Sequence, residues 1–207
     1  MAAIIFDFDG TIADSFETVI HIFHELTGRG EPLTPKEVER LRGMSLLRAA
    51  EELHVRPWKM PFLLMRGRRR MRKQIGQLHT FPDMPNVIKK LHHEGHQLFI
   101  MSSNSESNIK LFLKQHHLSK EFIQIYGNVG LLGKARKLRK VIKQNQLDQA
   151  TTWYVGDEVR DIVGSQQAGL RIAAVGWGYN TVDILRQHNP TRLLATPDEL
   201  LLLLEEI

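Results

Sequence analysis

The sequence of 207 residues contains no cysteine. A disulfide framework, a cysteine-ligated zinc site and a thiol nucleophile are therefore excluded, and the chain is compatible with a reducing compartment. Long apolar runs are also missing, because the leucine run at 200–204 is five residues long and Asp7 interrupts the apolar stretch near the N-terminus. Neither stretch approaches the roughly 20 residues needed to cross a bilayer. We expect a soluble, cytoplasmic protein with no membrane partner.

The composition lacks any strong bias, with 42% hydrophobic and 25% charged residues. This excludes a disordered tail, a collagen-like rod and a coiled coil. The net charge of +5 is local, because residues 66–73 hold six of the 28 Lys and Arg residues and the other 22 face 23 acids. A solvated helix face explains this run most simply, and a surface that attracts an anionic substrate or nucleic acid is the alternative. We expect no nucleic-acid partner.

The segment at 3–8 is rich in Ile and Phe and ends in Asp7-Phe8-Asp9-Gly10, which predicts a strand buried on both faces, as in a parallel sheet. From residue 82 onward, strand-length apolar segments alternate with segments of helical periodicity, which is typical of βαβ units. We expect strands at 97–101, 122–126, 152–155, 171–175 and 192–195, and helices at 85–94, 106–116, 134–145, 159–168 and from Pro197. The fold class is therefore α/β, with a Rossmann-like parallel sheet.

Residues 15–80 have a helical pattern throughout. Apolar residues recur at steps of three and four from Phe16 to Leu26, and Thr34-Pro35-Lys36-Glu37 has the residues of a capping box with a first-turn proline. Ser45 is placed to cap the next helix, and Pro61 must lie in the first turn of the one after it. We expect an α/β core of residues 1–14 and 81–207 with an inserted all-helical domain of residues 15–80.

Polar side chains follow three of the expected strands, namely Asp7, Asp9 and Thr11, then Ser102 and Asn104, then Asp157, Glu158 and Asp161. Ligands of open α/β sheets bind beyond the carboxyl ends of the strands. Carboxylates gathered there would repel one another without a cation, and hard oxygen ligands favour Mg²⁺. Lys134, which directly follows a glycine-containing turn, and a serine hydroxyl suit a phosphoryl group beside that ion.

The segment Asp7-Phe8-Asp9-Gly10-Thr11-Ile12-Ala13-Asp14-Ser15 closely resembles the first motif of the haloacid dehalogenase (HAD) superfamily, in its phosphatase branch. Ser102 resembles the second motif, Lys134 the third, and Gly156-Asp157-Glu158-Val159-Arg160-Asp161 the fourth. The four motifs come in family order with family-like spacing. The overall pattern is most similar to the phosphoglycolate phosphatase group, and the insertion resembles the helical C1-type cap of this superfamily.

The resemblance implies a phosphoric monoester hydrolase with a HAD-like core. Asp7 would be the nucleophile that forms an aspartyl-phosphate, and Asp9 the general acid and then the general base. The Mg²⁺ ligands would be Asp7, the backbone carbonyl of Asp9, and Asp157, while Asp161 either binds the ion or contacts its ligands. Ser102 and Lys134 would bind the phosphoryl oxygens, and Thr11 would support the loop.

Some assignments have neighbouring alternatives. Ser103 could replace Ser102, and Lys137 or Lys140 could replace Lys134. We favour Ser102 because it comes first after the apolar run, and Lys134 because it alone directly follows the turn. Glu158 is expected to be solvated, or at most to contact a metal ligand.

The substrate implied by the resemblance is a small phosphorylated metabolite, either phosphoglycolate-like or a sugar phosphate, which the cap would select. Arg42, between two expected helices, is a candidate substrate contact. Alternatives are a phosphomutase or a phosphonatase on the same core, or a nucleic-acid-binding protein that uses residues 66–73. A phosphonatase would add a Schiff-base lysine from the cap, where Lys59 and Lys73 are the only lysines of the second half. We expect a monomer or a homodimer.

Overall fold

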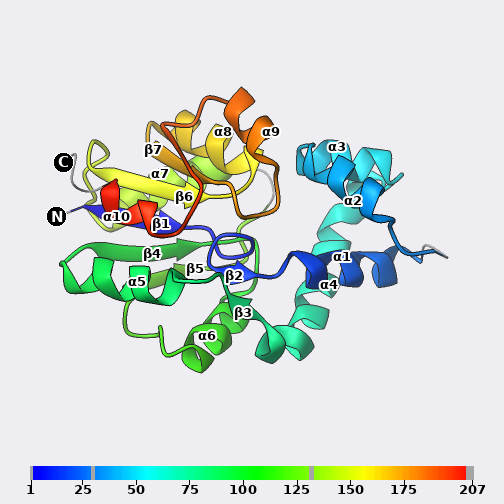
Figure 1. The fold of residues 1–207 in the computed structure, drawn as a ribbon, viewed down its shortest axis with the longest axis horizontal. Coiled ribbons are helices and arrows are strands. Elements are labelled where there is room, and N and C mark those ends of the chain that lie inside the picture. The colour runs from blue at the N-terminus through cyan, green and yellow to red at the C-terminus, as the bar shows by residue number, and fades with distance from the viewer. Residues whose placement is uncertain (1, 29–30, 131–132, 204–207) are drawn as a thin grey trace.

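A six-stranded parallel sheet forms the centre of the protein in the computed structural model, which describes residues 2–28, 31–130 and 133–203 (Figure 1). The strands lie in the order β5-β4-β1-β6-β7-β8, and every neighbouring pair is parallel. Their bounds are β1 (Ala3–Phe6), β4 (Gln97–Met101), β5 (Gln124–Tyr126), β6 (Thr152–Gly156), β7 (Arg171–Val175) and β8 (Arg192–Leu194). The predicted α/β fold with a parallel sheet is confirmed.

Helices cover both faces of this sheet, so its central strands are buried on both sides. Ile4 and Phe6 of β1 pack with α5 (Met84–His93), α6 (Glu106–Gln115) and α10 (Glu199–Leu202). Ala3 and Ile5 pack on the other face with α7 (Lys134–Gln144), α8 (Val159–Ala168) and α9 (Val182–Gln187). Because successive side chains of a strand point to opposite faces, this explains the unbroken apolar run of β1.

Four further helices lie beyond the carboxyl ends of the strands (Figure 1). They are α1 (Phe16–Thr27), α2 (Pro35–Arg42), α3 (Leu46–Glu52) and α4 (Met60–Gln74), with 3₁₀ turns at Pro57–Lys59 and Ile75–Gln77. The predicted capping box of α2 is present, with Pro35 in its first turn, and Pro61 lies in the first turn of α4. Ser45 does occupy the N-cap position of α3, but its side chain makes no capping hydrogen bond.

A short antiparallel pair, β2 (Ala13–Asp14) and β3 (His79–Thr80), joins the two chain passages between the sheet and these four helices. The expectation that residues 15–80 are all helical is therefore wrong at residues 79–80. Two-residue strands carry no periodic pattern that a sequence could display. The division into two domains stays a prediction, and this pair lies at both of its proposed boundaries.

Three smaller differences from the predicted elements concern the end of β1, the start of β5 and one helix. β1 ends at Phe6 and not at Phe8, because the carbonyl of Phe8 accepts hydrogen bonds from Thr11, Ile12 and Ala13 and so closes a turn. β5 begins at Gln124 and not at residue 122. α9 was not predicted at all.

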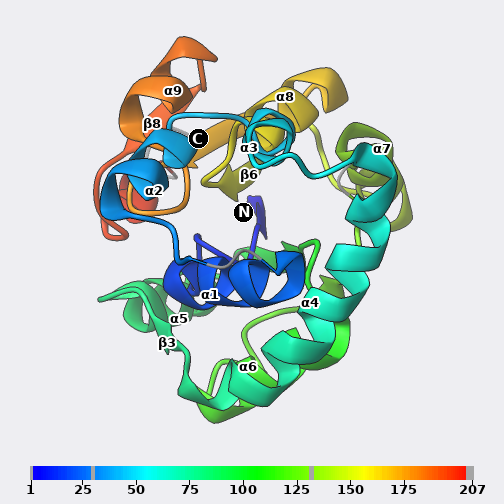
Figure 2. The same ribbon diagram turned by 90° about the vertical axis from the view of Figure 1, so that its right-hand side faces the viewer.

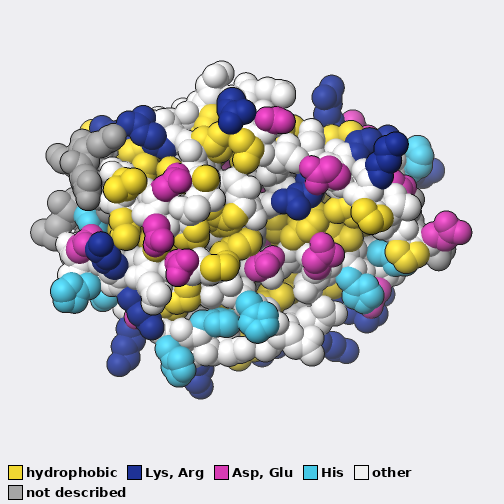
Figure 3. All heavy atoms as spheres, in the orientation of Figure 1, with side chains coloured by type: hydrophobic (Ala, Val, Ile, Leu, Met, Phe, Trp, Pro, Cys, Tyr) yellow, Lys and Arg dark blue, Asp and Glu magenta, His cyan; other side chains and the backbone are white. Residues whose placement is uncertain are grey.

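The basic residues at 66–73 lie in α4, and five of the six are exposed. Arg68 is the exception, because its Nε donates to the carbonyl of Ser103 at 2.7 Å. Figure 3 shows basic and acidic side chains interspersed over one face of the molecule, in agreement with a local basic segment. Within the described part of the chain, no helix is both long enough and apolar enough to cross a membrane.

Candidate active site

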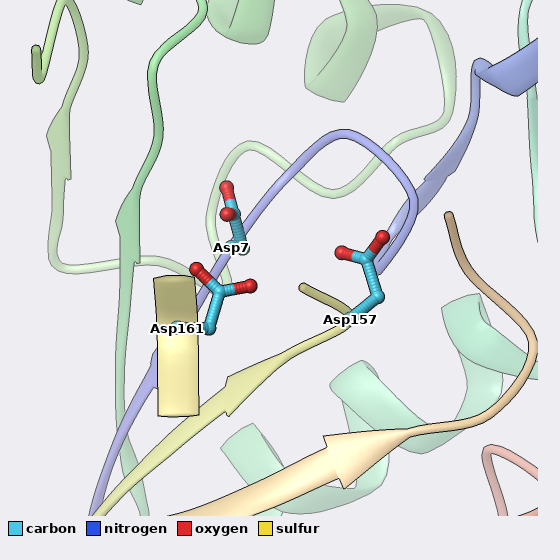
Figure 4. Close-up of side chains that lie close together, drawn as sticks. All are labelled: Asp7, Asp157 and Asp161. Carbon is cyan, nitrogen blue, oxygen red and sulfur yellow. The ribbon is translucent and has the colours of Figure 1, made fainter. Parts of the chain in front are cut away.

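Three buried carboxylates meet where the carboxyl ends of two neighbouring strands come together. Asp7 follows β1, Asp157 follows β6, and Asp161 lies in the first turn of α8. One oxygen of each lies within 4.8 Å of the others, and Figure 4 shows the three side chains around one space. Since Phe6 pairs with Val155 in parallel register, the next residues of β1 and β6 emerge side by side. This juxtaposition was predicted from the strand ends.

Lys134 supplies a cation to the three carboxylates from the first position of α7. Its buried Nζ donates to Oδ2 of Asp7 at 3.0 Å and to Oδ1 of Asp161. The two alternative lysines lie elsewhere, because Lys137 stacks on the ring of Tyr126 and Lys140 is exposed. The structure therefore brings Lys134, and not its neighbours, to the predicted nucleophile. Residues 131 and 132 of the preceding turn lie outside the described residues.

Arg160 is a second cation beside Asp7, and the sequence analysis gave it no role. Its Nη2 lies 3.9 Å from Oδ2 of Asp7, and its Nε donates to Oε1 of Glu158 at 2.9 Å. Glu158 is only 6% exposed, so the first of the two expectations for it, exposure to solvent, is wrong, while contact with a metal ligand stays a prediction. Its side chain forms the N-terminal capping box of α8 with Asp161. The sequence signal for a role of Arg160 was its position as a lone arginine among the acidic residues of the fourth motif.

The pKa values of the three carboxylates are shifted in different directions by burial and by neighbouring charges. Burial alone would raise the pKa of Asp7, but the charges of Lys134 and Arg160 outweigh it and hold that pKa below its usual value. Burial raises the pKa of Asp161 to about 6 against the opposing charge of Lys134. Burial and the charges of Glu158 and Asp161 raise the pKa of Asp157 well above its usual value.

This donor set fits a hard divalent cation. Among the described residues, the possible metal ligands that converge here are oxygen atoms of three buried carboxylates. Burial and the repulsion from neighbouring carboxylates raise the pKa of Asp157, and a cation between the carboxylates would relieve that repulsion. The cluster could therefore hold a metal ion. The predicted role of the Asp9 carbonyl as a further ligand stays a prediction.

Hydrogen bonds from the loop after β1 and from the segment after β7 hold the carboxylate of Asp157 in place. Thr11 Oγ1 donates to Oδ1 of Asp157 at 2.7 Å, and the backbone N–H of Tyr179 donates to Oδ2 at 2.8 Å. A Cβ at Gly10 would lie 2.1 Å from Oδ2 of Asp157, and Gly10 has a φ of +76°. Only glycine fits this position, which explains its place in the first motif. The role of Thr11 in supporting the loop stays a prediction.

Asp9 lies apart from the three-carboxylate cluster and lines a cavity beside it. Ser15 Oγ donates to its Oδ1 at 2.9 Å, and Asn104 Nδ2 donates to its Oδ2 at 3.0 Å. Burial raises the pKa of Asp9 to about 6, while the hydrogen bond from Ser15 acts in the opposite direction. Asp9 can therefore gain and lose a proton near neutral pH, as a general acid and base must.

Ser102 directly follows β4, the other neighbour of β1, and is buried. Its Oγ accepts the backbone N–H of Asn104 at 3.2 Å. The alternative residue, Ser103, lines the cavity and accepts a hydrogen bond from Arg68 at its carbonyl. Both serines thus lie near the predicted site, and phosphate binding by Ser102 stays a prediction.

The cavity beside Asp9 has a volume of about 260 Å³ and lies between the sheet edge and helices α1–α4. Figure 2 shows α1 and α4 meeting on one side, with α2 and α3 on the other. Arg42 lines this cavity, but its Nη2 and Nε donate to the carbonyls of Gly178 and Tyr179 at 2.7 and 3.1 Å. Contact with a substrate by Arg42 stays a prediction.

Tyr179 and Asn180 are lining residues that the sequence analysis missed. The hydroxyl of Tyr179 lies 2.8 Å from Ser15 Oγ, and Asn180 Nδ2 donates to the carbonyls of Arg42 and Met44. Both follow β7, whose neighbour β6 ends at Gly156, directly before Asp157. Their position after a strand of the parallel sheet was the signal that could have predicted them.

A family model described as "haloacid dehalogenase-like hydrolase" matches residues 4–175. Because the match covers most of the chain, the protein belongs to this family. It is therefore an enzyme of the hydrolase class, as the sequence predicts, and the expected resemblance is confirmed.

Particular relatives are similar along nearly their whole length. The phosphoglycolate phosphatase of Synechococcus elongatus is 34% identical over 203 residues, covering 97% of this chain and 96% of the relative. A 5′-nucleotidase of Pseudomonas aeruginosa is 25% identical over 204 residues, covering 93% and 90%. The crystal structure of a predicted phosphatase from Clostridium acetobutylicum has a TM-score of 0.84 at 18% identity, covering 100% of this chain and 99% of that one. This last likeness confirms the fold.

Proposed function

We propose that the protein is a Mg²⁺-dependent phosphatase that hydrolyses a small phosphorylated metabolite through an aspartyl-phosphate on Asp7. The observation that carries the proposal is the contact of Asp7 with Lys134 and Arg160 inside a buried carboxylate cluster. It keeps Asp7 ionised and able to attack phosphorus. Family membership and the phosphatase names of the relatives support the same reaction.

In the first half-reaction, a carboxylate oxygen of Asp7 forms a bond to phosphorus while the bond from phosphorus to the leaving oxygen breaks. Asp9 gives its proton to that oxygen, so the alcohol leaves uncharged. In the second, Asp9 takes a proton from water, which attacks the aspartyl-phosphate, and inorganic phosphate and the Asp7 carboxylate are released. The pKa of Asp9, raised to about 6, suits both transfers.

Asp7, Asp157 and the Asp9 carbonyl would hold Mg²⁺, with Asp161 either binding the ion or contacting its ligands. When bound, the ion would supply positive charge that offsets the negative charge of the phosphoryl group in the transition state. Lys134 donates to the nucleophile and to Asp161, so it orients Asp7 and stabilises added negative charge. Ser102 would bind a phosphoryl oxygen.

Residues 15–80 would act as a cap that closes over the site and excludes water. In support, Arg42 and Arg68 both donate to backbone carbonyls of the core segments that follow β7 and β4. The name of the Synechococcus relative makes phosphoglycolate one substrate to test, with sugar phosphates as the other class expected from the sequence. Arg42 would contact the substrate at the cavity wall.

The alternatives have less support from the described residues. Neither Lys59 nor Lys73 lines the cavity, so no cap lysine is placed for the Schiff base of a phosphonatase. Arg68, at the centre of the basic segment, is turned to the core and not to solvent. Nothing specific favours a phosphomutase.

Asp7→Asn tests the nucleophile. It removes the attacking carboxylate with little change in shape, so we expect no hydrolysis of p-nitrophenyl phosphate and a circular dichroism spectrum like that of the wild type. ³²P-labelled substrate should label the acid-quenched wild type and not the variant. Turnover by the variant at the wild-type rate would refute the mechanism.

Metal dependence is tested by removing divalent ions with EDTA. Activity should disappear and return on addition of Mg²⁺ in excess of the chelator, because the buried carboxylates then regain a counter-charge. Full activity in EDTA would contradict the role of the ion. The role of Asp7 as the nucleophile would then still be tested by Asp7→Asn alone.

A further inference from the structure

The lining of the cavity beside Asp9 changes from polar to apolar along the length of the cavity. Its polar lining residues gather at the sheet edge, where Asp9, Asn104 and Arg160 face it. Away from that edge, the helices contribute apolar side chains that are only half-buried, among them Val19, Phe23, Leu26, Ala49, Leu63 and Leu64. The end next to the reacting groups is therefore polar, and the far end offers apolar surface.

The cations that line the cavity already have partners. Among the described lining residues of the four helices, only Arg42 and Arg68 are charged, and both donate to core carbonyls. Arg42 also stacks on the ring of Phe16, and Arg160 is paired with Glu158. The apolar side chains at the far end offer no hydrogen bond to a carboxylate, so burying one there would be costly.

We propose that the preferred substrate is a phosphate monoester of an apolar alcohol, aromatic or branched aliphatic, whose hydrocarbon part occupies the space between α1, α3 and α4. This rests on the proposed phosphatase function and narrows its substrate class away from short hydroxy acids and sugars. The size fits, because an apolar cavity of about 150 Å³ accepts benzene and this one measures about 260 Å³. The phosphate would lie at the polar end, next to Asp9.

Gly67 offers a direct way to fill that space. It lies in α4 and lines the cavity, and a Cβ placed there would come no closer than 4.0 Å to Ile22 and Leu26 of α1. A larger side chain at residue 67 would therefore occupy the volume proposed for the alcohol. Met65, in the same helix, is 44% exposed and does not line the cavity, so Met65→Trp is a matched control.

The experiment compares kcat/KM for benzyl, cyclohexylmethyl and ethyl phosphates, 2-phosphoglycolate and glucose 6-phosphate, with Mg²⁺ present. All are esters of primary alcohols, which limits differences in leaving-group chemistry. We expect benzyl and cyclohexylmethyl phosphates to exceed ethyl phosphate and 2-phosphoglycolate by about tenfold or more, because each buried methylene is worth about tenfold or more in an apolar pocket. Gly67→Leu should abolish the benzyl-to-ethyl preference, and Met65→Trp should leave the ratio unchanged.

The outcomes separate this proposal from the phosphatase function on which it rests. Preference for 2-phosphoglycolate or glucose 6-phosphate, or equal values for benzyl and ethyl phosphates, would overturn the apolar substrate class and leave the phosphatase function intact. A Gly67→Leu enzyme that folds, as judged by circular dichroism, and keeps the wild-type ratio would also overturn it. Hydrolysis of none of the five esters would refute the phosphatase function and this proposal together.

Discussion

Replacing Lys134 by methionine tests whether its charge holds the carboxylate cluster together. The buried ammonium group lies 3.0 Å from Oδ2 of Asp7 and also contacts Asp161. At an effective dielectric constant of about 20, one such pair is worth about 5–6 kcal/mol before the cost of burying the charges is subtracted. Methionine keeps the length of the side chain but leaves Arg160, 3.9 Å from Asp7, as the nearest described cation.

Removing one partner of a buried ion pair costs about 3–5 kcal/mol, because the other charge remains without compensation. We expect Lys134→Met to lower the free energy of unfolding by that amount when urea unfolding is followed in EDTA. We also expect hydrolysis to fall about 10²–10³-fold, as when one donor to a developing charge is lost.

Lys140→Met is the matched control, since Lys140 is an exposed residue of the same helix. Its effect on unfolding should stay within about 0.5 kcal/mol. The electrostatic reasoning is refuted if the two variants lose the same stability. It is equally refuted if Lys134→Met retains wild-type activity.

Three other changes probe separate contacts. Gly10→Ala should lower the free energy of unfolding by about 1–2 kcal/mol, because residue 10 has a left-handed backbone conformation that alanine disfavours. The new Cβ would also collide with Asp157, so activity should fall. Wild-type stability in urea would contradict this reasoning. Ser15→Ala removes a hydrogen bond that lowers the pKa of Asp9, so the pKa of Asp9 should rise above about 6. Because a general acid works in its protonated form, the alkaline limb of the profile of kcat/KM against pH should move to higher pH. An alkaline limb that does not move would argue against the role of Asp9. Arg42→Ala should speed hydrogen exchange at the Thr181 amide, which donates to the Arg42 carbonyl. The control Arg40→Ala removes an ion pair with Glu52 and should leave this exchange rate unchanged. Equal exchange rates in both variants would count against a role of the Arg42 side chain in holding the helices to the core.

Sequence reasoning recovered the sheet and much of the site because both follow from local patterns. An apolar run followed by polar residues marks a strand end, and parallel strands place their carboxyl ends together. Asp7, Asp157 and Asp161 come together in this way. Lys134 could be chosen over its neighbours because it alone directly follows the glycine turn.

The parts that were missed depend on contacts between distant segments. Arg160 belongs to the fourth motif, yet only the folded chain shows that its side chain lies near Asp7. Glu158 looks like a surface acid until Arg160 and the start of α8 enclose it. The bonds from Arg42 to Gly178 and Tyr179 span more than 130 positions, so no local pattern could announce them.

The pairing of β2 with β3 has a consequence for how this enzyme can change over time. Asp14 lies opposite His79, so the chain departs toward the four helices and returns from them at nearly one point. A segment whose two ends adjoin can be shortened, lengthened or exchanged while the strands that carry Asp7 and Asp157 keep their register. The walls of the cavity can therefore diverge between descendants of one ancestral gene faster than the carboxylates at its base.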